Sequence, residues 1–294
     1  MRKTLTVLSI SLCCFFLSGF QSVIAAQDIE ELTARANKQG DSEAQFYLGL
    51  AFEAGDGAPQ DYKQAVSWYT KAAEQGQAVA QFNLGVMYAN GQGVLQDYKQ
   101  AVSWYTKAAE QGYAGAQSNL GGMYANGQGV LEDYKQAVSW YTKAAEQGQA
   151  VAQFNLGGKY YKGQGVLQDY KQAVFWYTKS AEQGDAAAQY NLGVMYAGGQ
   201  AVLQDYKQAV SWYTKAAEQG YAGAQSNLGV MYYNGQGVLQ DYAVAYAWWN
   251  IAAFQGNADA TYNRDIILNK MSPDQISKGQ ELAVKLLKKI EARK

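Results

Sequence analysis

The chain contains no histidine, and only two cysteines and two prolines occur among its 294 residues. Histidine is the commonest general base and the commonest metal ligand, so its absence argues against both kinds of site. Lys and Arg number 24 against 25 Asp and Glu, which leaves no basic surplus to neutralise nucleic-acid phosphates. Apolar residues are abundant: they make up 48% of the chain against 17% for charged residues, a balance typical of a folded protein.

Residues 1–25 are typical of an export signal. Arg2 and Lys3 precede an apolar run, and small residues up to Ala25 come before an acidic stretch. An uncleaved membrane anchor is the alternative, but the run is shorter than the ~20 residues that span a bilayer. Cleavage after Ala25 would remove Cys13 and Cys14 and leave no thiol for a disulfide or a metal site. We therefore expect an exported protein, periplasmic or secreted, with no membrane span in its mature form.

Tryptophan recurs at a fixed interval along the rest of the chain. Six tryptophans lie 36 residues apart, at Trp68, Trp104, Trp140, Trp176, Trp212 and Trp248, and only Trp249 lies off this grid. Such a period indicates stacked repeats rather than one globular core. We expect an N-terminal capping helix at 26–40, six repeats and a C-terminal helical cap at 257–294. The repeats are expected at 41–76, 77–112, 113–148, 149–184, 185–220 and 221–256.

Each repeat is predicted to be a pair of helices. In the second repeat, Leu84 and Tyr88 fall on one face of a first helix, called helix A here. Gly91 stands where a helix ends in left-handed backbone. Asp97 is a suitable N-cap for a second helix, helix B, whose apolar face includes Trp104.

Small residues in each repeat have a packing role. Gly85 and Ala101 allow the helix backbones to approach closely, while Trp104 and Tyr88 fill the space between neighbouring pairs. A lone pair could not bury this surface, whereas a stack of pairs can.

The repeat resembles the Sel1-like repeat, a relative of the tetratricopeptide repeat. The motif reads Ala80-x-x-x-Leu84-Gly85-x-x-Tyr88-x-x-Gly91-x-Gly93-Val94-x-x-Asp97-Tyr98-x-x-Ala101-x-x-Trp104-Tyr105-x-x-Ala108-Ala109-x-x-Gly112. The resemblance implies an all-α, right-handed α-solenoid, a superhelix of stacked antiparallel helix pairs with helices A on the concave side. It also implies roles in bacterial adaptor complexes, envelope signalling and host contact. Ala201 replaces the second loop glycine, which we expect to alter only the local geometry.

Both ends of the array are predicted to be caps. Leu32 and Ala36 suit a lone helix ahead of the first pair. Beyond the sixth repeat, Arg264 stands where the motif requires leucine, so stacking is expected to end there. Ser272 then begins a final helix, with Gln275 completing a capping box.

An exposed stripe along helices A is the predicted binding surface. Asparagine recurs in it, and a side-chain amide can both donate to and accept from an extended peptide backbone. The alternative left open is that each asparagine bonds to its neighbour's backbone and only joins helices. Methionines beside the stripe suit either an adaptable surface or a core gap. The predicted partner-binding residues are Asn83, Val86, Asn90, Asn119, Met123, Asn126, Asn155, Lys159, Lys162, Asn191, Met195, Asn227, Met231 and Asn234.

Two lysines distinguish the fourth repeat. Lys159 and Lys162 are predicted to form a positive spot for an acidic group of a partner, the alternative being a solvated surface pair. Tyrosines outside the repeat columns, such as Tyr161 and Tyr190, offer rings on which a sugar could stack.

No catalytic constellation is evident. Ser103 and Lys107 recur on the outer polar face, where nothing would bury the lysine so that it activates the serine. We therefore predict a non-enzymatic, exported scaffold, without cofactor or metal, that binds a protein or peptide on the concave helix-A face. Its expected role lies in envelope complex assembly, signalling or host interaction. A carbohydrate- or peptidoglycan-binding module is the alternative, and a β-lactamase-like hydrolase, implied only by cysteine-rich relatives, comes third.

Overall fold

The computed structural model describes residues 29–38 and 40–293, and all regular structure in them is helical. The predicted fold class, all-α, is therefore confirmed. The predicted signal peptide at 1–25 lies outside the described residues. Within the described part, no helix combines the length and apolar character needed to cross a membrane. The chain forms two compact units, one ending at Trp140 and the other beginning at Tyr141.

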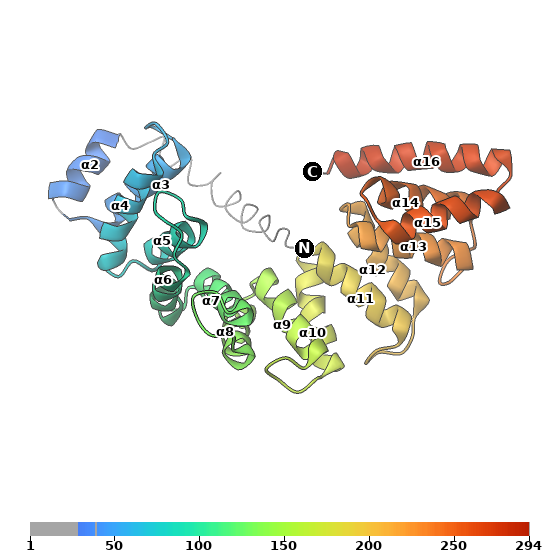
Figure 1. Ribbon diagram of the computed structural model, residues 1–294, viewed down its shortest axis with the longest axis horizontal. Helices are drawn as coiled ribbons and strands as arrows, with labels where there is room; N and C mark the ends of the chain where they lie inside the picture. Colours follow the sequence, from blue (N-terminus) through green and yellow to red (C-terminus); the bar gives the residue numbers. More distant parts are fainter. Residues whose placement is uncertain (1–28, 39, 294) are drawn as a thin grey trace. The chain divides into compact units, whose positions relative to one another are not determined.

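The first unit is a succession of helices in which each helix from α2 to α6 packs against the next (Figure 1). A single helix precedes the first pair, and the odd-numbered helices that follow are helices A. The helices are α2 (Ile29–Lys38), α3 (Ser42–Ala54), α4 (Tyr62–Glu74), α5 (Ala78–Asn90), α6 (Tyr98–Glu110), α7 (Ala114–Asn126) and α8 (Tyr134–Glu146), and the division between the units falls within α8.

The second unit continues the same order of pairs, and each helix from α9 to α15 contacts the next. It comprises α9 (Ala150–Lys162), α10 (Tyr170–Glu182), α11 (Ala186–Gly198), α12 (Tyr206–Glu218), α13 (Ala222–Asn234), α14 (Tyr242–Phe254), α15 (Ala258–Ile267), the 3-10 helix η1 (Leu268–Lys270) and α16 (Pro273–Glu291). Stacked helix pairs of this kind make the protein an α-solenoid, as predicted.

Local sequence signals set the helix ends. The carboxylate of Asp97 accepts a hydrogen bond from the backbone N–H of Gln100 at 3.1 Å and caps α6. Gly91 ends α5 with a φ of 70°, a left-handed conformation that glycine adopts without a steric penalty. Helix α16 begins with the predicted capping box between Ser272 and Gln275.

In five of the helix pairs, the core forms where a glycine of helix A faces an aromatic ring of helix B. A Cβ atom at Gly85 would lie 2.6 Å from Cδ1 of Tyr105, so only glycine admits the ring this closely. In the last pair, Trp249 takes this place against Gly229, and its Nε1 donates to the Ser226 carbonyl at 2.9 Å. Trp249 therefore replaces a member of the buried tyrosine column, which consists of Tyr69, Tyr105, Tyr141, Tyr177 and Tyr213.

Neighbouring pairs are joined by the predicted tryptophans and by a buried amide that the sequence analysis missed. Trp104 packs against the core of the preceding pair. The Gln81 side chain is 4% exposed; its Nε2 donates to the Ala73 carbonyl at 3.0 Å, and its Oε1 accepts from Gln111 at 2.8 Å. Equivalent bonds recur at Gln45, Gln153, Gln189 and Gln225.

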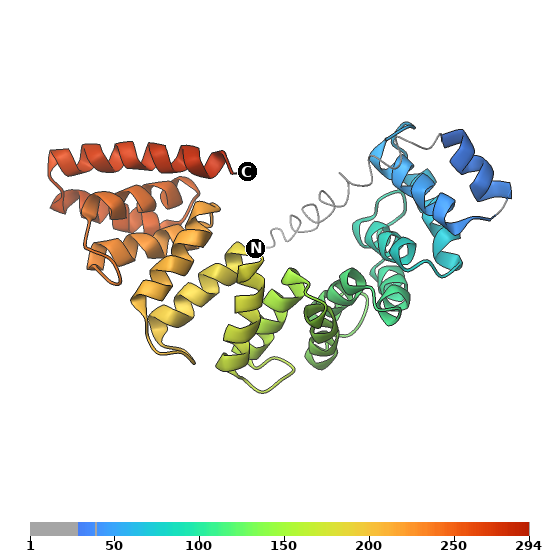
Figure 2. The same cartoon turned by 180° about the vertical axis from the view of Figure 1, so that it is seen from behind.

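Helix α16 packs along α14 at the C-terminal end of the second unit (Figure 2). Its apolar face buries Ala283 and Ile290. Near its end, Lys289 and Arg293 form ion pairs with Glu218 of α12 at 2.6 and 2.8 Å. The last helix thus covers the final pair and reaches back to the one before it.

The loop between α11 and α12 departs from the others. Ala201 has a φ of 61° and is the one residue other than glycine with a positive φ in the described part of the chain. At the equivalent position of the next repeat, Gly237 has a φ of 73°, and a Cβ atom there would collide with the Tyr206 carbonyl oxygen. The altered local geometry expected at Ala201 is therefore a strained backbone.

Replacing this alanine by the glycine of the other loops should stabilise the second unit. We expect Ala201→Gly to raise the free energy of unfolding by about 1 kcal/mol, because an L-residue with a side chain pays roughly that to adopt left-handed backbone. Urea titration followed by circular dichroism measures the change. Gly237→Ala is the matched reverse substitution and should lower the urea midpoint; equal midpoints for all three proteins would contradict the assignment of strain.

Alkaline pH should destabilise the second unit through its buried tyrosines. Burial raises the pKa of Tyr141, Tyr177 and Tyr213 from 10.0 to about 12. Below pH 10 the phenols are protonated in both states, and the stability is fully present. Between pH 10 and 12 the unfolded chain ionises first, so each tyrosine removes up to ~2.7 kcal/mol of stability. Urea titrations across this window measure the loss.

Tyrosinate absorbance supplies the control for this pH dependence. We expect absorbance from the buried tyrosines to appear together with the loss of helical circular dichroism. Complete ionisation near pH 10 with the helical signal intact would show that the phenols are not held in a dry core.

Candidate functional site

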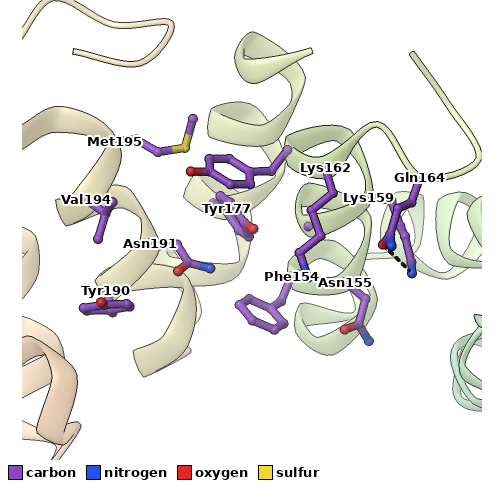
Figure 3. A pocket seen from close by; sticks show the side chains of 12 residues that line it. Phe154, Asn155, Lys159, Lys162, Gln164, Tyr177, Tyr190, Asn191, Val194 and Met195 are labelled. Atoms are coloured by element: carbon purple, nitrogen blue, oxygen red, sulfur yellow. Dashed lines mark hydrogen bonds between the residues drawn. The ribbon is translucent and has the colours of Figure 1, made fainter. Parts of the chain in front are cut away.

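The predicted binding surface contains a cavity in the second unit. It lies between α9 and α11 and has a volume of about 390 Å³ (Figure 3). Tyr177 of α10 also lines it. The predicted residues that it brings together are Asn155, Lys159, Lys162, Asn191 and Met195.

Departures of α9 from the other helices A open this cavity and give it charge. Gly158 stands where three other helices A carry valine. A Cβ atom at Gly158 would meet only the Tyr177 hydroxyl, at 3.6 Å, so the space in front of this position is open. Lys159 stands where four helices A carry methionine, and Lys162 where three carry asparagine. The two lysines were predicted from the sequence, whereas Gly158 was not.

The two lysines make the cavity positively charged. Lys159 Nζ donates a hydrogen bond to Gln164 Oε1 at 3.2 Å, and the Lys162 side chain is exposed. No aspartate or glutamate lines the cavity. In Figure 3 both lysines come from α9: Lys162 lies on the side of α11, where Asn191 faces it, and Lys159 runs beside Gln164. An anionic group that enters this space therefore meets cations and amides but no carboxylate.

Asparagines along helices A lie beside buried tyrosine hydroxyls of the preceding helix B. The neighbours are Asn119 and Tyr105, Asn191 and Tyr177, and Asn227 and Tyr213. Burial raises the pKa of these phenols, and the neighbouring amides lower it by a smaller amount. The asparagines are therefore placed between helix pairs, next to a tyrosine hydroxyl rather than the expected backbone group.

The methionines of the predicted surface lie in the core. Met123, Met195 and Met231 are at most 5% exposed, so of the two uses that the sequence left open for them, the structure shows the filling of core gaps. They pack among alanines and tyrosines of helices B, because these small alanines leave gaps that a flexible thioether chain fills. Met195 also reaches the lining of the cavity.

The remaining predicted residues do not line the cavity. Asn83 and Val86 are half-buried on α5, whereas Asn90, Asn126 and Asn234 are exposed at the ends of their helices. Asn90 Nδ2 donates to Gln92 Oε1 at 3.2 Å, a contact within its own turn. Among the described residues, no cluster of His, Cys, Asp and Glu is arranged to hold a metal ion.

A row of exposed leucines was also not predicted from the sequence. They occupy the loop between helix A and helix B in five repeats and are 89–93% exposed: Leu95, Leu131, Leu167, Leu203 and Leu239. Their 36-residue recurrence between a half-buried valine and the capping aspartate is the signal that could have identified them.

Known proteins contain repeats of this kind. A family model for the Sel1 repeat matches residues 42–77, 78–113, 114–149, 150–185, 186–221 and 222–257. A Sel1 repeat protein from Oxalobacter formigenes is 35% identical; the match covers 78% of this chain and 100% of that one, with a TM-score of 0.67. A protective antigen of uropathogenic Escherichia coli that displays an SLR fold is 31% identical, over 87% and 86% of the two chains, with a TM-score of 0.39. The comparison with curated proteins gave no match.

The family match agrees with the fold and with the packing of the repeats. Six consecutive matched segments cover the stacked helix pairs of both units. Proteins built from such repeats generally serve as scaffolds for protein–protein interaction. The chain belongs to the Sel1 repeat family.

Proposed function

We propose that this protein is a non-enzymatic, exported bacterial scaffold that binds a segment of a partner protein on the helix-A surface of its second unit. The helix-A surface is the face of α9 and α11 around the cavity, and it includes Asn155, Gly158, Lys162 and Val194. The cavity is the observation that supports this proposal, because it lies where the sequence of α9 departs from the regular repeat. Regular helix pairs account for the scaffold, whereas these departures create open space with polar groups.

The lining chemistry supports binding rather than hydrolysis. It combines aromatic rings, three amides and two lysines, and it includes neither a hydroxyl of serine or threonine nor a carboxylate. Apolar walls with a few converging polar groups are the usual composition of a recognition pocket. Asn155 is half-buried at the rim, where its amide can pair with a peptide backbone.

Filling the cavity should abolish partner binding without unfolding the protein. Gly158→Val introduces the side chain that α5, α11 and α13 already carry at this position, and the nearest atom to the new Cβ is the Tyr177 hydroxyl at 3.6 Å. We expect affinity capture from envelope extracts to recover the same proteins with the wild type and with Gly122→Val, its counterpart in α7, but to lose them with Gly158→Val.

Identical capture by all three proteins would contradict the location of the binding surface. The urea midpoint of each variant is the folding control. A carbohydrate ligand is the second candidate, because Tyr161 and Tyr190 also line the cavity. Glycan-array binding that Gly158→Val removes, combined with no protein capture, would favour it.

Export is tested independently of binding. We expect the mature protein to begin at Ala26, because cleavage after Ala25 leaves small residues at the positions that signal peptidase reads. Mass spectrometry of the N-terminal peptide from the envelope or secreted fraction checks this. A full-length chain beginning at Met1 and confined to the cytoplasm would rule out export.

A further inference from the structure

We propose that the cavity between α9 and α11 selects a carboxylate that is followed or preceded by an apolar side chain in the bound segment. This inference rests on the proposed function and specifies what the helix-A surface recognises. It arises from the division of the cavity into a cationic part and an apolar part.

The cationic part is formed by α9 and the turn after it. Lys159 Nζ lies 3.2 Å from Gln164 Oε1, so a neutral amide oxygen holds its ammonium group beside the opening. A carboxylate is a stronger acceptor than this amide, because both partners of the hydrogen bond then carry charge. Lys162 is exposed one helical turn further on and adds a second positive charge to this part of the cavity. No aspartate or glutamate is among the residues that line the cavity.

The apolar part is formed by rings that are held in place by their neighbours. Phe154 of α9 lies 5.8 Å from Tyr177, measured between ring centroids. Tyr190 of α11 lies 6.0 Å from Tyr213 and 5.0 Å from Tyr221. With Val194 on the same helix, these rings form a wall whose shape is set before a ligand arrives.

The combination of two lysines with an apolar wall does not recur at the next helix A, α11. Helix α11 carries Met195 where α9 has Lys159, and Gly198 where α9 has Lys162. Met195 is 1% exposed and belongs to the core. We therefore expect the carboxylate of the bound segment to lie at one position along the second unit, beside the two lysines. This position would determine where the rest of the segment binds.

Peptide-library selection tests this inference. Random peptides are displayed in two formats, inside a coat-protein loop and at a free C-terminus, and selected on the immobilised full protein. The test variant is Lys159→Met with Lys162→Asn, which restores the side chains of other helices A. The control is Lys171→Asn with Lys207→Asn, which removes the same charge from exposed positions on helices B.

The wild type and the control should select peptides with Asp or Glu next to an apolar residue, about tenfold enriched over the test variant. Enrichment in the internal format assigns the group to a side chain, whereas enrichment confined to the free C-terminus assigns it to the terminal carboxylate. Each of these results supports the inference.

Two other results would overturn it, and they separate the inference from the proposed function. If Gly158→Val abolishes binding of the selected peptides but these peptides show neither a preference for Asp or Glu nor a requirement for a free C-terminus, the surface binds protein segments and the carboxylate inference fails alone. If Gly158→Val leaves the binding of every selected peptide unchanged, both fail.

Discussion

The contact between a helix-A glycine and a helix-B aromatic ring sets the geometry on which the rest of the protein depends. Because Gly85 has no side chain, the ring of Tyr105 lies against the backbone of α5 and is buried. The ring fills the space within the pair, and its hydroxyl lies close enough to Asn119 of the next pair for that amide to lower the pKa of the phenol. One residue column therefore sets the separation of helices within a pair and provides a polar contact to the following one. Packing and polar connection are coupled, so a larger residue at the glycine would disturb both.

Much of the fold is predictable because its signals are local. The capping role of Asp97 and the left-handed glycine at Gly91 depend only on nearby backbone, and the 36-residue period reveals the stack. The depth of burial was harder to predict. Near-identical repeats copy surface and core positions alike, so recurrence does not separate a buried Gln81 or Met123 from the exposed Leu95. That distinction depends on how helices turn toward their neighbours, which requires tertiary contacts.

The candidate site was predictable in its charge but not in its shape. Lys159 and Lys162 interrupt their columns and are visible in the sequence. Gly158 resembles the structural glycine next to it, and only the contacts distinguish them: a Cβ atom at Gly157 would lie 2.8 Å from the Tyr177 ring, whereas one at Gly158 meets nothing closer than 3.6 Å. One glycine therefore admits a core side chain, and the other leaves open space. The surroundings of Asn191 were likewise not predictable from its column, because only the structure places it beside the buried hydroxyl of Tyr177.

In a repetitive scaffold, a residue that departs from the repeat indicates function only when it lies together with other groups that could bind a ligand. Ala201 departs from its column as clearly as Lys159 does, yet it contributes backbone strain at an exposed loop and does not line the cavity between α9 and α11. Phe175 replaces an outer-face serine and packs on Trp176, with ring centroids 4.9 Å apart, which is a local contact. In α9, by contrast, two cations, missing side-chain volume and a rigid aromatic wall coincide within one cavity. Independent departures that converge on one space are the reason to place recognition there, since the regular repeats already provide all the packing that the stack requires.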